Sequence, residues 1–181
     1  MTTVLIVPGL GNSGPDHWQT HLQARLPAAR RVEMTEWDRP DLADWVRTLE
    51  KAVQEAADRD GQGPVVLVGH SLGCIAIAHW SREGSVAAVR GALLVAPPDI
   101  GDQTRAPAET WGFAPVPEHR LPFPATVVAS RNDPYMTFAR AEAVAAAWGA
   151  PLLDAGHAGH INSASGHGRW ELAERLVAGL L

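Results

Sequence analysis

The segment from residue 65 to residue 80 constrains the fold more than any other part of the chain. Val65–Val68 is a short apolar run of mostly β-branched residues, which predicts a buried strand. Cys74–Trp80 is a second apolar run without glycine or proline, which suits a buried helix. Only the five residues Gly69–Gly73 separate the two runs, so the chain must turn very tightly from strand to helix. A buried strand that leads directly into a helix is typical of α/β domains with a parallel sheet.

The turn itself has the pattern Gly-x-Ser-x-Gly, with glycine at positions 69 and 73 and serine at position 71. Side chains two residues before and after the serine would collide with the neighbouring strand and helix, so both positions favour glycine. The serine hydroxyl then stands clear of the chain beside a helix N-terminus, where free N–H groups and the helix dipole favour negative charge. This pattern is typical of a nucleophile elbow, with Ser71 as nucleophile and the Leu72 amide as an oxyanion donor. Because the pattern also arises by chance in glycine-rich chains, the prediction requires a base and an acid further along.

Other short apolar runs extend the alternation of strands and helices over the whole chain. The predicted strands are Thr3–Val7, Arg31–Met34, Val65–Val68, Ala92–Val95, Ala125–Ala129 and Pro151–Leu153. The predicted helices are Asp16–Leu26, Asp41–Ala57, Cys74–Trp80, Met136–Trp148 and Arg169–Leu180. Without a repeat or a linker, residues 1–181 are expected to form one domain. The expected fold is a three-layer α/β/α sandwich with about six parallel strands, right-handed crossovers and functional groups at the carboxyl ends of the strands.

Composition and charge argue against several classes of function. The net charge of −5 and the pI near 5.9, with basic residues scattered along the chain, argue against nucleic-acid binding. No stretch approaches the apolar length of a membrane span. The segment Met1–Gly11 lacks a basic region and its apolar run is too short for a signal peptide, so we expect a soluble, cytoplasmic protein. The single cysteine, Cys74, cannot form an intramolecular disulfide, and its apolar neighbours predict a buried side chain.

A glycine-rich loop, Pro8–Pro15, follows the first predicted strand and contains the dinucleotide-binding spacing G-x-G-x-x-G. Proline closes the loop, however, and only Glu33 and Glu36 lie near the place of the acidic residue that such a site uses. Nucleotide binding is therefore the weaker alternative. In the favoured interpretation the loop brings a backbone N–H, that of Leu10, to the oxyanion site beside Ser71.

Two histidines, His17 and His21, lie four residues apart on one face of the first predicted helix, as in zinc proteases. The glutamate that follows the first histidine in those enzymes is replaced here by Trp18, so the pair does not indicate a metal site. We expect neither a metal nor a cofactor.

The longest irregular stretch, Ala96–Pro124, contains seven prolines, at positions 97, 98, 107, 115, 117, 122 and 124. A loop of this length in a compact domain is usually functional or disordered. One hypothesis is that it lines an acyl pocket, with Trp111 and Phe113 as apolar, substrate-binding walls. The alternative is that both aromatic side chains pin the loop to the core.

A serine hydroxyl needs a base, and the base needs a carboxylate that orients it. In α/β hydrolases the nucleophile, the acid and the histidine follow one another along the chain, each at the carboxyl end of a strand. Asp133 lies just after the fifth predicted strand and is favoured over Asp154, which is only three residues from His157 and too local to orient a distant base. His157 and His160 both follow the sixth strand, and the residues alone do not decide between them.

The chain resembles a family of small, lidless serine hydrolases with the α/β-hydrolase fold, that of retinoblastoma-binding protein 9 and the bacterial YdeN proteins. The segments that carry the resemblance are VPGLGNS after the first strand, Trp18 in the next helix, VLVGHSLGCIA at the turn, SRNDPY at the acid and GHINSASGHG near the end. The resemblance runs over most of the chain. It implies an α/β-hydrolase fold without a cap domain.

The resemblance also implies roles for residues of the site. Ser71 corresponds to the nucleophile, Asp133 to the acid and His160 to the base, because the family pattern G-H-x-N is matched by Gly159–Asn162 and not at His157. The L-x-C-x-E motif from which the family takes its retinoblastoma partner lacks its glutamate here, since the corresponding residues are LGCIA. That partner is therefore not expected.

The expected function is that of a carboxylesterase-like serine hydrolase acting on small or short-chain carboxylic esters through an acyl-enzyme intermediate. Without a cap domain the pocket should be shallow and open. The alternative is a non-catalytic binding protein that keeps the same fold.

Overall fold

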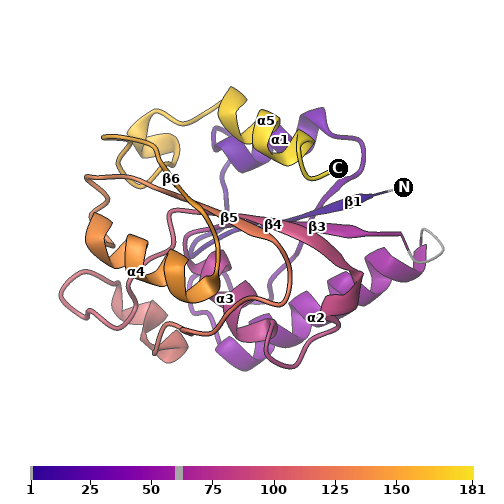
Figure 1. Ribbon diagram of the computed structural model, residues 1–181, viewed down its shortest axis with the longest axis horizontal. Coiled ribbons are helices and arrows are strands. Elements are labelled where there is room, and N and C mark those ends of the chain that lie inside the picture. The colour runs from indigo at the N-terminus through magenta and orange to yellow at the C-terminus, as the bar shows by residue number, and fades with distance from the viewer. Residues whose placement is uncertain (1, 60–62) are drawn as a thin grey trace.

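A six-stranded sheet forms the centre of the computed structural model, which describes residues 2–59 and 63–181 (Figure 1). The strands are β1 Thr3–Val7, β2 Ala29–Arg31, β3 Val65–His70, β4 Val89–Val95, β5 Ala125–Ala129 and β6 Leu152–Asp154. All neighbouring strands are parallel, in the order β2-β1-β3-β4-β5-β6. The chain runs outward from β1 to β2 and then returns to place β3 on the other side of β1. The carboxyl ends of β1 and β3 therefore form a topological switch point, where open α/β sheets bind ligands.

Helices cover both faces of the sheet, which confirms the predicted three-layer α/β/α fold (Figure 1). On one face lie α1 Trp18–Arg25 and α5 Glu171–Ala178; on the other lie α2 Leu42–Arg59, α3 Leu72–Trp80 and α4 Phe138–Trp148. Three short 3-10 helices, η1 Val86–Ala88, η2 Ala108–Phe113 and η3 Ser163–Ser165, lie in the connections. Within the described ranges no cap domain is inserted between the strands.

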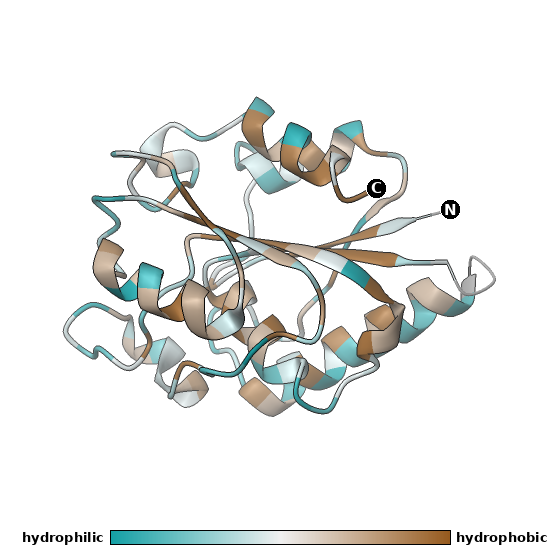
Figure 2. Cartoon of the chain, viewed as in Figure 1, coloured by the Kyte–Doolittle hydropathy of each residue, from teal (hydrophilic) through white to brown (hydrophobic). Residues whose placement is uncertain are grey.

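Side chains of the strands point alternately into two cores. In β1, Leu5 and Val7 face the core under α2 and α3, whereas Val4 and Ile6 face the core under α1 and α5. Because both faces of the strands are buried, the strands carry continuous apolar runs without polar alternation. Figure 2 shows hydrophobic residues gathered along the strands, and hydrophobic and hydrophilic residues interspersed along α2 and α5.

Helix α3 is the most deeply buried helix, and only His79 among its residues has appreciable exposure. Its Cys74 is buried as predicted, and the thiol donates a hydrogen bond to the Val95 carbonyl at 3.4 Å. Burial raises the pKa of this thiol well above its usual range. Cys74 is therefore a packing residue and not a reactive thiol.

The second strand is shorter and earlier than predicted: β2 spans Ala29–Arg31, whereas the apolar pattern indicated Arg31–Met34. Val32 and Met34 are buried, but they pack into the core from the loop that follows the strand. The Val32 N–H still donates to Ile6 at 2.9 Å. The pattern thus identified burial correctly, but burial at a sheet edge does not require strand pairing.

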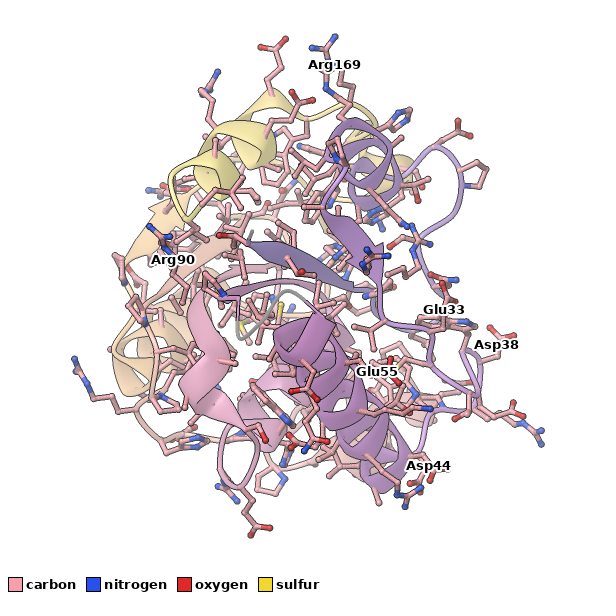
Figure 3. The ribbon with its side chains drawn as sticks, turned by 90° about the vertical axis from the view of Figure 1, so that its right-hand side faces the viewer. Glu33, Asp38, Asp44, Glu55, Arg90 and Arg169 are labelled. Atoms are coloured by element: carbon pink, nitrogen blue, oxygen red, sulfur yellow. The ribbon has the colours of Figure 1, made fainter. Side chains whose placement is uncertain are left out.

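Most charged residues lie on the outside of the molecule, and Asp133 is a buried exception. Figure 3 shows Glu33, Asp38 and Arg169 projecting outward from its surface. No helix in residues 2–59 or 63–181 has the length and apolarity needed to cross a membrane.

Strained backbone is concentrated in the loops at the carboxyl ends of the strands. The described residues other than glycine with positive φ are Asn12, Ser71, Ala96 and Ile161, with φ of 65°, 53°, 51° and 47°. Each lies in a loop that follows a different strand: β1, β3, β4 or β6. Such conformations cost about 1–3 kcal/mol each and cluster at functional sites. The carboxyl ends of the strands are therefore the candidate location of a functional site.

Candidate active site

Ser71 stands at the N-terminus of α3 in an unusual backbone conformation, with φ 53° and ψ −127°. A Cβ atom at Gly69 would lie 2.9 Å from Ile77 Cδ1, and one at Gly73 would lie 2.6 Å from the carbonyl oxygen of Pro8. Glycine is required at position 73, because the atoms in the way belong to the backbone at the end of β1. At position 69 the fit is tight against α3, where the Cys74 amide nitrogen would lie 3.2 Å from a Cβ atom. The geometry is the tight strand-to-helix turn that the spacing predicts.

The glycine loop after β1 lies directly against this turn. A Cβ atom at Gly9 would lie 2.8 Å from the Ser71 Cβ atom and 3.2 Å from the amide nitrogen of Leu72. Leu72 is the first residue of α3, so its N–H has no acceptor within the helix. The Leu10 N–H has no hydrogen-bond partner in the described part of the chain. Both predicted oxyanion donors thus remain available to an oxygen atom bound beside Ser71.

Three side chains from three separate loops form a hydrogen-bonded chain. His160 Nε2 lies 2.8 Å from Ser71 Oγ, and His160 Nδ1 lies 2.9 Å and 3.0 Å from the carboxylate oxygens of Asp133. His160 and Asp133 are each only 8% exposed. In a neutral imidazole that donates Nδ1–H to Asp133, Nε2 carries no proton and can accept the one from the Ser71 hydroxyl. The Tyr135 ring packs edge-on against the imidazole, with ring centres 4.6 Å apart.

Hydrogen bonds join the loop of Asp133 to the loop of His160. The Gly159 N–H donates to Asn132 Oδ1 at 2.8 Å, and the Ala158 N–H donates to Ser130 Oγ at 2.9 Å. The loop after β5 therefore fixes both the carboxylate and the backbone just before the histidine.

Two further residues hold the backbone at and after His160. The Trp18 Nε1–H donates to the Ile161 carbonyl at 2.9 Å, and the His70 Nε2–H donates to the His160 carbonyl at 3.0 Å. These bonds hold Ile161 in its positive-φ conformation. Sequence patterns assigned neither Trp18 nor His70 to the site. The position of His70 beside Ser71 was the one local signal available.

The alternative acid and base lie away from this arrangement. Asp154 is exposed and forms an ion pair with Arg131, with 2.6 Å between Arg131 Nη2 and Asp154 Oδ2. His157 is exposed on the outer part of the same loop as His160. Neither lines the pocket around Ser71.

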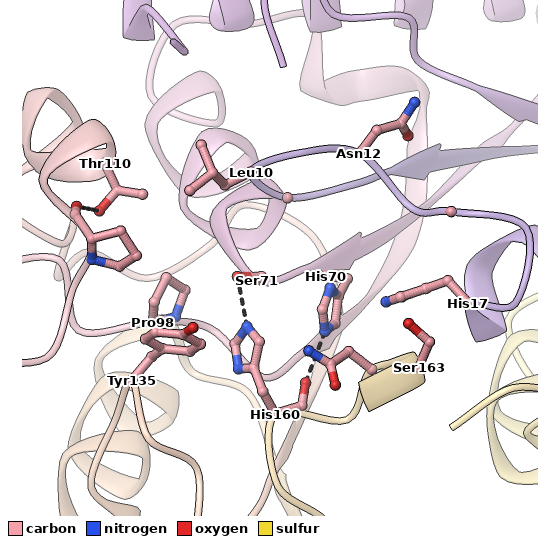
Figure 4. Close-up of a pocket in the computed structure, with 14 residues that line it drawn as sticks. Leu10, Asn12, His17, His70, Ser71, Pro98, Thr110, Tyr135, His160 and Ser163 are labelled. Atoms are coloured by element: carbon pink, nitrogen blue, oxygen red, sulfur yellow. Dashed lines mark hydrogen bonds between the residues drawn. The ribbon is translucent and has the colours of Figure 1, made fainter. Parts of the chain in front are cut away.

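A pocket of about 220 Å³ opens over Ser71 and His160 (Figure 4). One side is built by residues of the loop after β4 together with Tyr135, and the other side is polar. The lining residues are Gly9, Leu10, Asn12, Gly14, His17, His70, Ser71, Pro98, Pro107, Thr110, Tyr135, His160, Asn162 and Ser163.

The two aromatic residues predicted to line the pocket lie elsewhere. Phe113 is fully buried and packs edge-on against Trp45, with ring centres 5.5 Å apart. Trp111 is 40% exposed, and its indole N–H donates to the Ala106 carbonyl at 3.1 Å. The proline-rich loop does reach the pocket, but through other side chains. The sequence pattern does not show which face of η2 turns toward Ser71, because that depends on how η2 packs on the core.

Two histidines that line the pocket with Ser71 are held neutral. Burial, together with the positive charge of Arg31, lowers the pKa of His17 to about 4. Burial and the neighbouring His160 lower the pKa of His70 well below its usual range. His17 also caps α1, because its Nδ1 atom accepts a hydrogen bond from the Gln19 N–H at 3.1 Å.

A family model of serine hydrolases matches residues 4–179 of the chain. The chain belongs to the serine hydrolase family. A protein from Pectobacterium atrosepticum, described as a YdeN-like hydrolase, is 34% identical, with a TM-score of 0.85 over 99% of this chain and 90% of that one. The ydeN gene product of B. subtilis is 23% identical, with a TM-score of 0.78 over 99% and 98% of the two chains. A comparison with curated proteins found no match.

More distant solved structures share the fold of this serine hydrolase. Est1E from Butyrivibrio proteoclasticus, solved with ferulic acid bound, is 13% identical, with a TM-score of 0.72 over 98% of this chain and 90% of that one. At that identity the likeness concerns the fold alone. The glycine loop after β1 packs directly against the turn that carries Ser71, and only glycine at position 9 allows this close approach. That contact favours the oxyanion interpretation of the loop over the nucleotide-binding alternative.

Proposed function

We propose that this serine hydrolase cleaves small or short-chain carboxylic esters through an acyl-enzyme intermediate on Ser71. The observation that carries the proposal is the unbroken hydrogen-bonded chain from Ser71 through His160 to Asp133. A serine hydroxyl becomes nucleophilic at neutral pH when a base stands within hydrogen-bond reach and a third group orients that base.

In the first step His160 Nε2 takes the proton of Ser71 as the hydroxyl oxygen attacks the ester carbonyl. Asp133 holds the imidazole in the required tautomer and stabilises its positive charge. The amides of Leu72 and Leu10 bind the oxyanion, and one such donor contributes about 3 kcal/mol. His160 then protonates the leaving alcohol, and the acyl group remains on Ser71.

In the second step His160 activates water, which attacks the acyl-enzyme. The tetrahedral intermediate collapses, the proton returns to Ser71, and the carboxylic acid is released.

The size and covering of the pocket support a small substrate. Its volume of about 220 Å³ lies below the range of typical drug-sized sites. Pro98 and Pro107 provide rigid apolar surface on one side, suited to a short alkyl chain. Structures of an esterase from Thermogutta terrifontis, which has the same fold, are consistent with an ester substrate.

A chain-length screen tests the proposal. We expect p-nitrophenyl esters from acetate to hexanoate to be hydrolysed with kcat/KM falling beyond butyrate or pentanoate, and peptide amides to be turned over far more slowly. Ser71→Ala should abolish turnover while its thermal unfolding remains that of the wild type. Turnover that survives in Ser71→Ala would contradict the proposal. The alternative of a non-catalytic binding protein predicts no turnover in either variant.

A further inference from the structure

The polar side of the pocket contains a hydrogen-bond donor with a fixed tautomer. His17 is 95% buried, with 5% of its surface exposed, and it lines the pocket. Its Nδ1 atom accepts the Gln19 N–H, so in the neutral ring the proton sits on Nε2. Within the described residues Nε2 has no hydrogen-bond partner, yet it is not sealed from solvent. The Nε2–H therefore faces the pocket as an unused donor.

A matching acceptor lies beside it. The His70 Nε2–H donates to the His160 carbonyl, which leaves His70 Nδ1 without a proton. His70 Nδ1 also lacks a partner among the residues described and is not sealed from solvent. The two rings are neighbours, with centres 4.7 Å apart.

The position of this donor and acceptor relates them to the reacting group. Figure 4 shows His17 and His70 on one side of Ser71, opposite Pro98 and Thr110. The carbonyl carbon of an ester carries two substituents, the acyl chain and the alkoxy group, which point in different directions. One substituent can lie on the apolar side, and the other then reaches the histidine side.

We propose that the His17 and His70 pair binds an uncharged hydroxyl group on one substituent of the substrate ester. A hydroxyl is both donor and acceptor, so its oxygen can accept from His17 Nε2–H while its proton is donated to His70 Nδ1. An alkyl substituent in the same place would leave this donor and this acceptor without partners. Binding sites of this kind discriminate strongly in favour of substrates that carry the polar group. The inference rests on the proposed esterase function and names the class of ester: a hydroxyl-bearing one.

Two substitutions separate the helix-capping role of His17 from its role in the pocket. His17→Asn retains an acceptor near the Nδ1 position, which can cap α1, but removes the donor at the Nε2 position. His17→Gln retains a donor near the Nε2 position and removes the cap. A purely structural role for His17 predicts that the Gln variant is the more impaired in every measurement. His21→Asn, on the same helix but outside the pocket, is the matched control.

The experiment compares esters that differ by hydroxyl against methyl. In the alcohol series 2-hydroxyethyl butyrate is compared with propyl butyrate; in the acyl series the p-nitrophenyl esters of 3-hydroxybutanoate and 3-methylbutanoate are compared. Each rate is normalised to alkaline hydrolysis of the same ester. We expect the wild type to prefer the hydroxyl-bearing member in one series by about tenfold in kcat/KM, the scale of one or two net hydrogen bonds.

The preference should fall to about twofold or less in His17→Asn and persist in His17→Gln and His21→Asn. Ester turnover without a hydroxyl preference in either series, or a preference unchanged in His17→Asn, would overturn this inference and leave the esterase proposal intact. Absence of turnover of any ester by the wild type would overturn both.

Discussion

Ser71 and His160 meet in one pocket but are positioned by different means. Ser71 is held by packing: its turn joins β3 directly to α3, and glycines allow the close contacts on either side. His160 follows β6, a strand of three residues at the sheet edge, and its backbone is held by hydrogen bonds from distant segments such as Trp18. We infer that changes at the nucleophile turn act first on folding, and changes around the base act first on rate.

The largest expected effect concerns Asp133, the carboxylate that we propose orients His160. Asp133→Asn leaves the shape of the site intact but favours the wrong imidazole tautomer, which lowers kcat by about 10⁴ in hydrolases of this mechanism. Steady-state kinetics with a p-nitrophenyl ester measures the change. Asp154→Asn is the control and should remain within about twofold of wild type, because Asp154 pairs with Arg131 outside the pocket. A large loss in Asp154→Asn with a small one in Asp133→Asn would reverse the assignment.

The next effect tests the packing of the nucleophile turn. Gly73→Ala places a methyl group against the carbonyl oxygens of Val7 and Pro8, and should lower the free energy of unfolding by more than about 4 kcal/mol. Gly156→Ala, in the loop of the base, has open space around its Cβ and only a positive φ of 69° to accommodate. It should lower that free energy by about 1–2 kcal/mol. Urea unfolding measures both losses. Equal losses in the two variants would contradict the inference that packing is tighter at the Ser71 turn than in the loop of His160.

These two parts of the site also differ in how far the sequence predicts them. The turn at Ser71 was predictable because its requirements are local: an apolar run, two glycines and a second apolar run within residues 65–80. Most strands and helices were predictable for the same reason, since burial on both sides of a parallel sheet leaves continuous apolar runs. The edge strand β2 was misplaced because Val32 and Met34 are buried without pairing.

The surroundings of His160 could not be derived in this way. The choice between His157 and His160 came from family resemblance, because both follow the same strand. The hydrogen bond from Trp18 to Ile161 joins residues that are 143 positions apart in the sequence, and no local sequence pattern predicts it. The inward turn of Phe113 and the outward turn of Trp111 likewise depend on how η2 packs on Trp45.

A smaller effect is expected in the pH dependence of stability, through the buried His17. The pKa of His17 is about 4 in the folded protein and 6.5 as its ordinary value, so the unfolded chain takes up a proton that the folded one does not. Its contribution to stability is therefore complete above pH 6.5 and is lost as the pH falls toward 4. At pH 5 the loss from this group is about 2 kcal/mol. Between pH 7 and pH 5, the free energy of unfolding measured with urea should fall by about 2 kcal/mol less in His17→Gln than in the wild type. An equal fall in the two proteins would show that His17 is not buried as a neutral ring.

The smallest effect tests the hydrogen bonds that hold the base. Trp18→Phe keeps an aromatic ring in the core but leaves the Ile161 carbonyl without its donor. We expect kcat to fall about tenfold, with KM nearly unchanged and a loss of stability of about 1–3 kcal/mol. Trp45→Phe serves as the control for removing an indole, because the Trp45 N–H makes a longer 3.4 Å bond and the residue does not line the pocket of His160. Equal effects on kcat in the two variants would remove the distinction between packing and positioning.

The central claim is that Ser71 is the nucleophile activated by His160. The most direct measurement is intact-mass analysis after treatment with a fluorophosphonate, followed by peptide mapping of the modified residue. We expect one covalent adduct, located on Ser71, and no adduct on folded Ser71→Ala. A folded wild-type protein that stays unmodified, or an adduct that persists in Ser71→Ala, would contradict it.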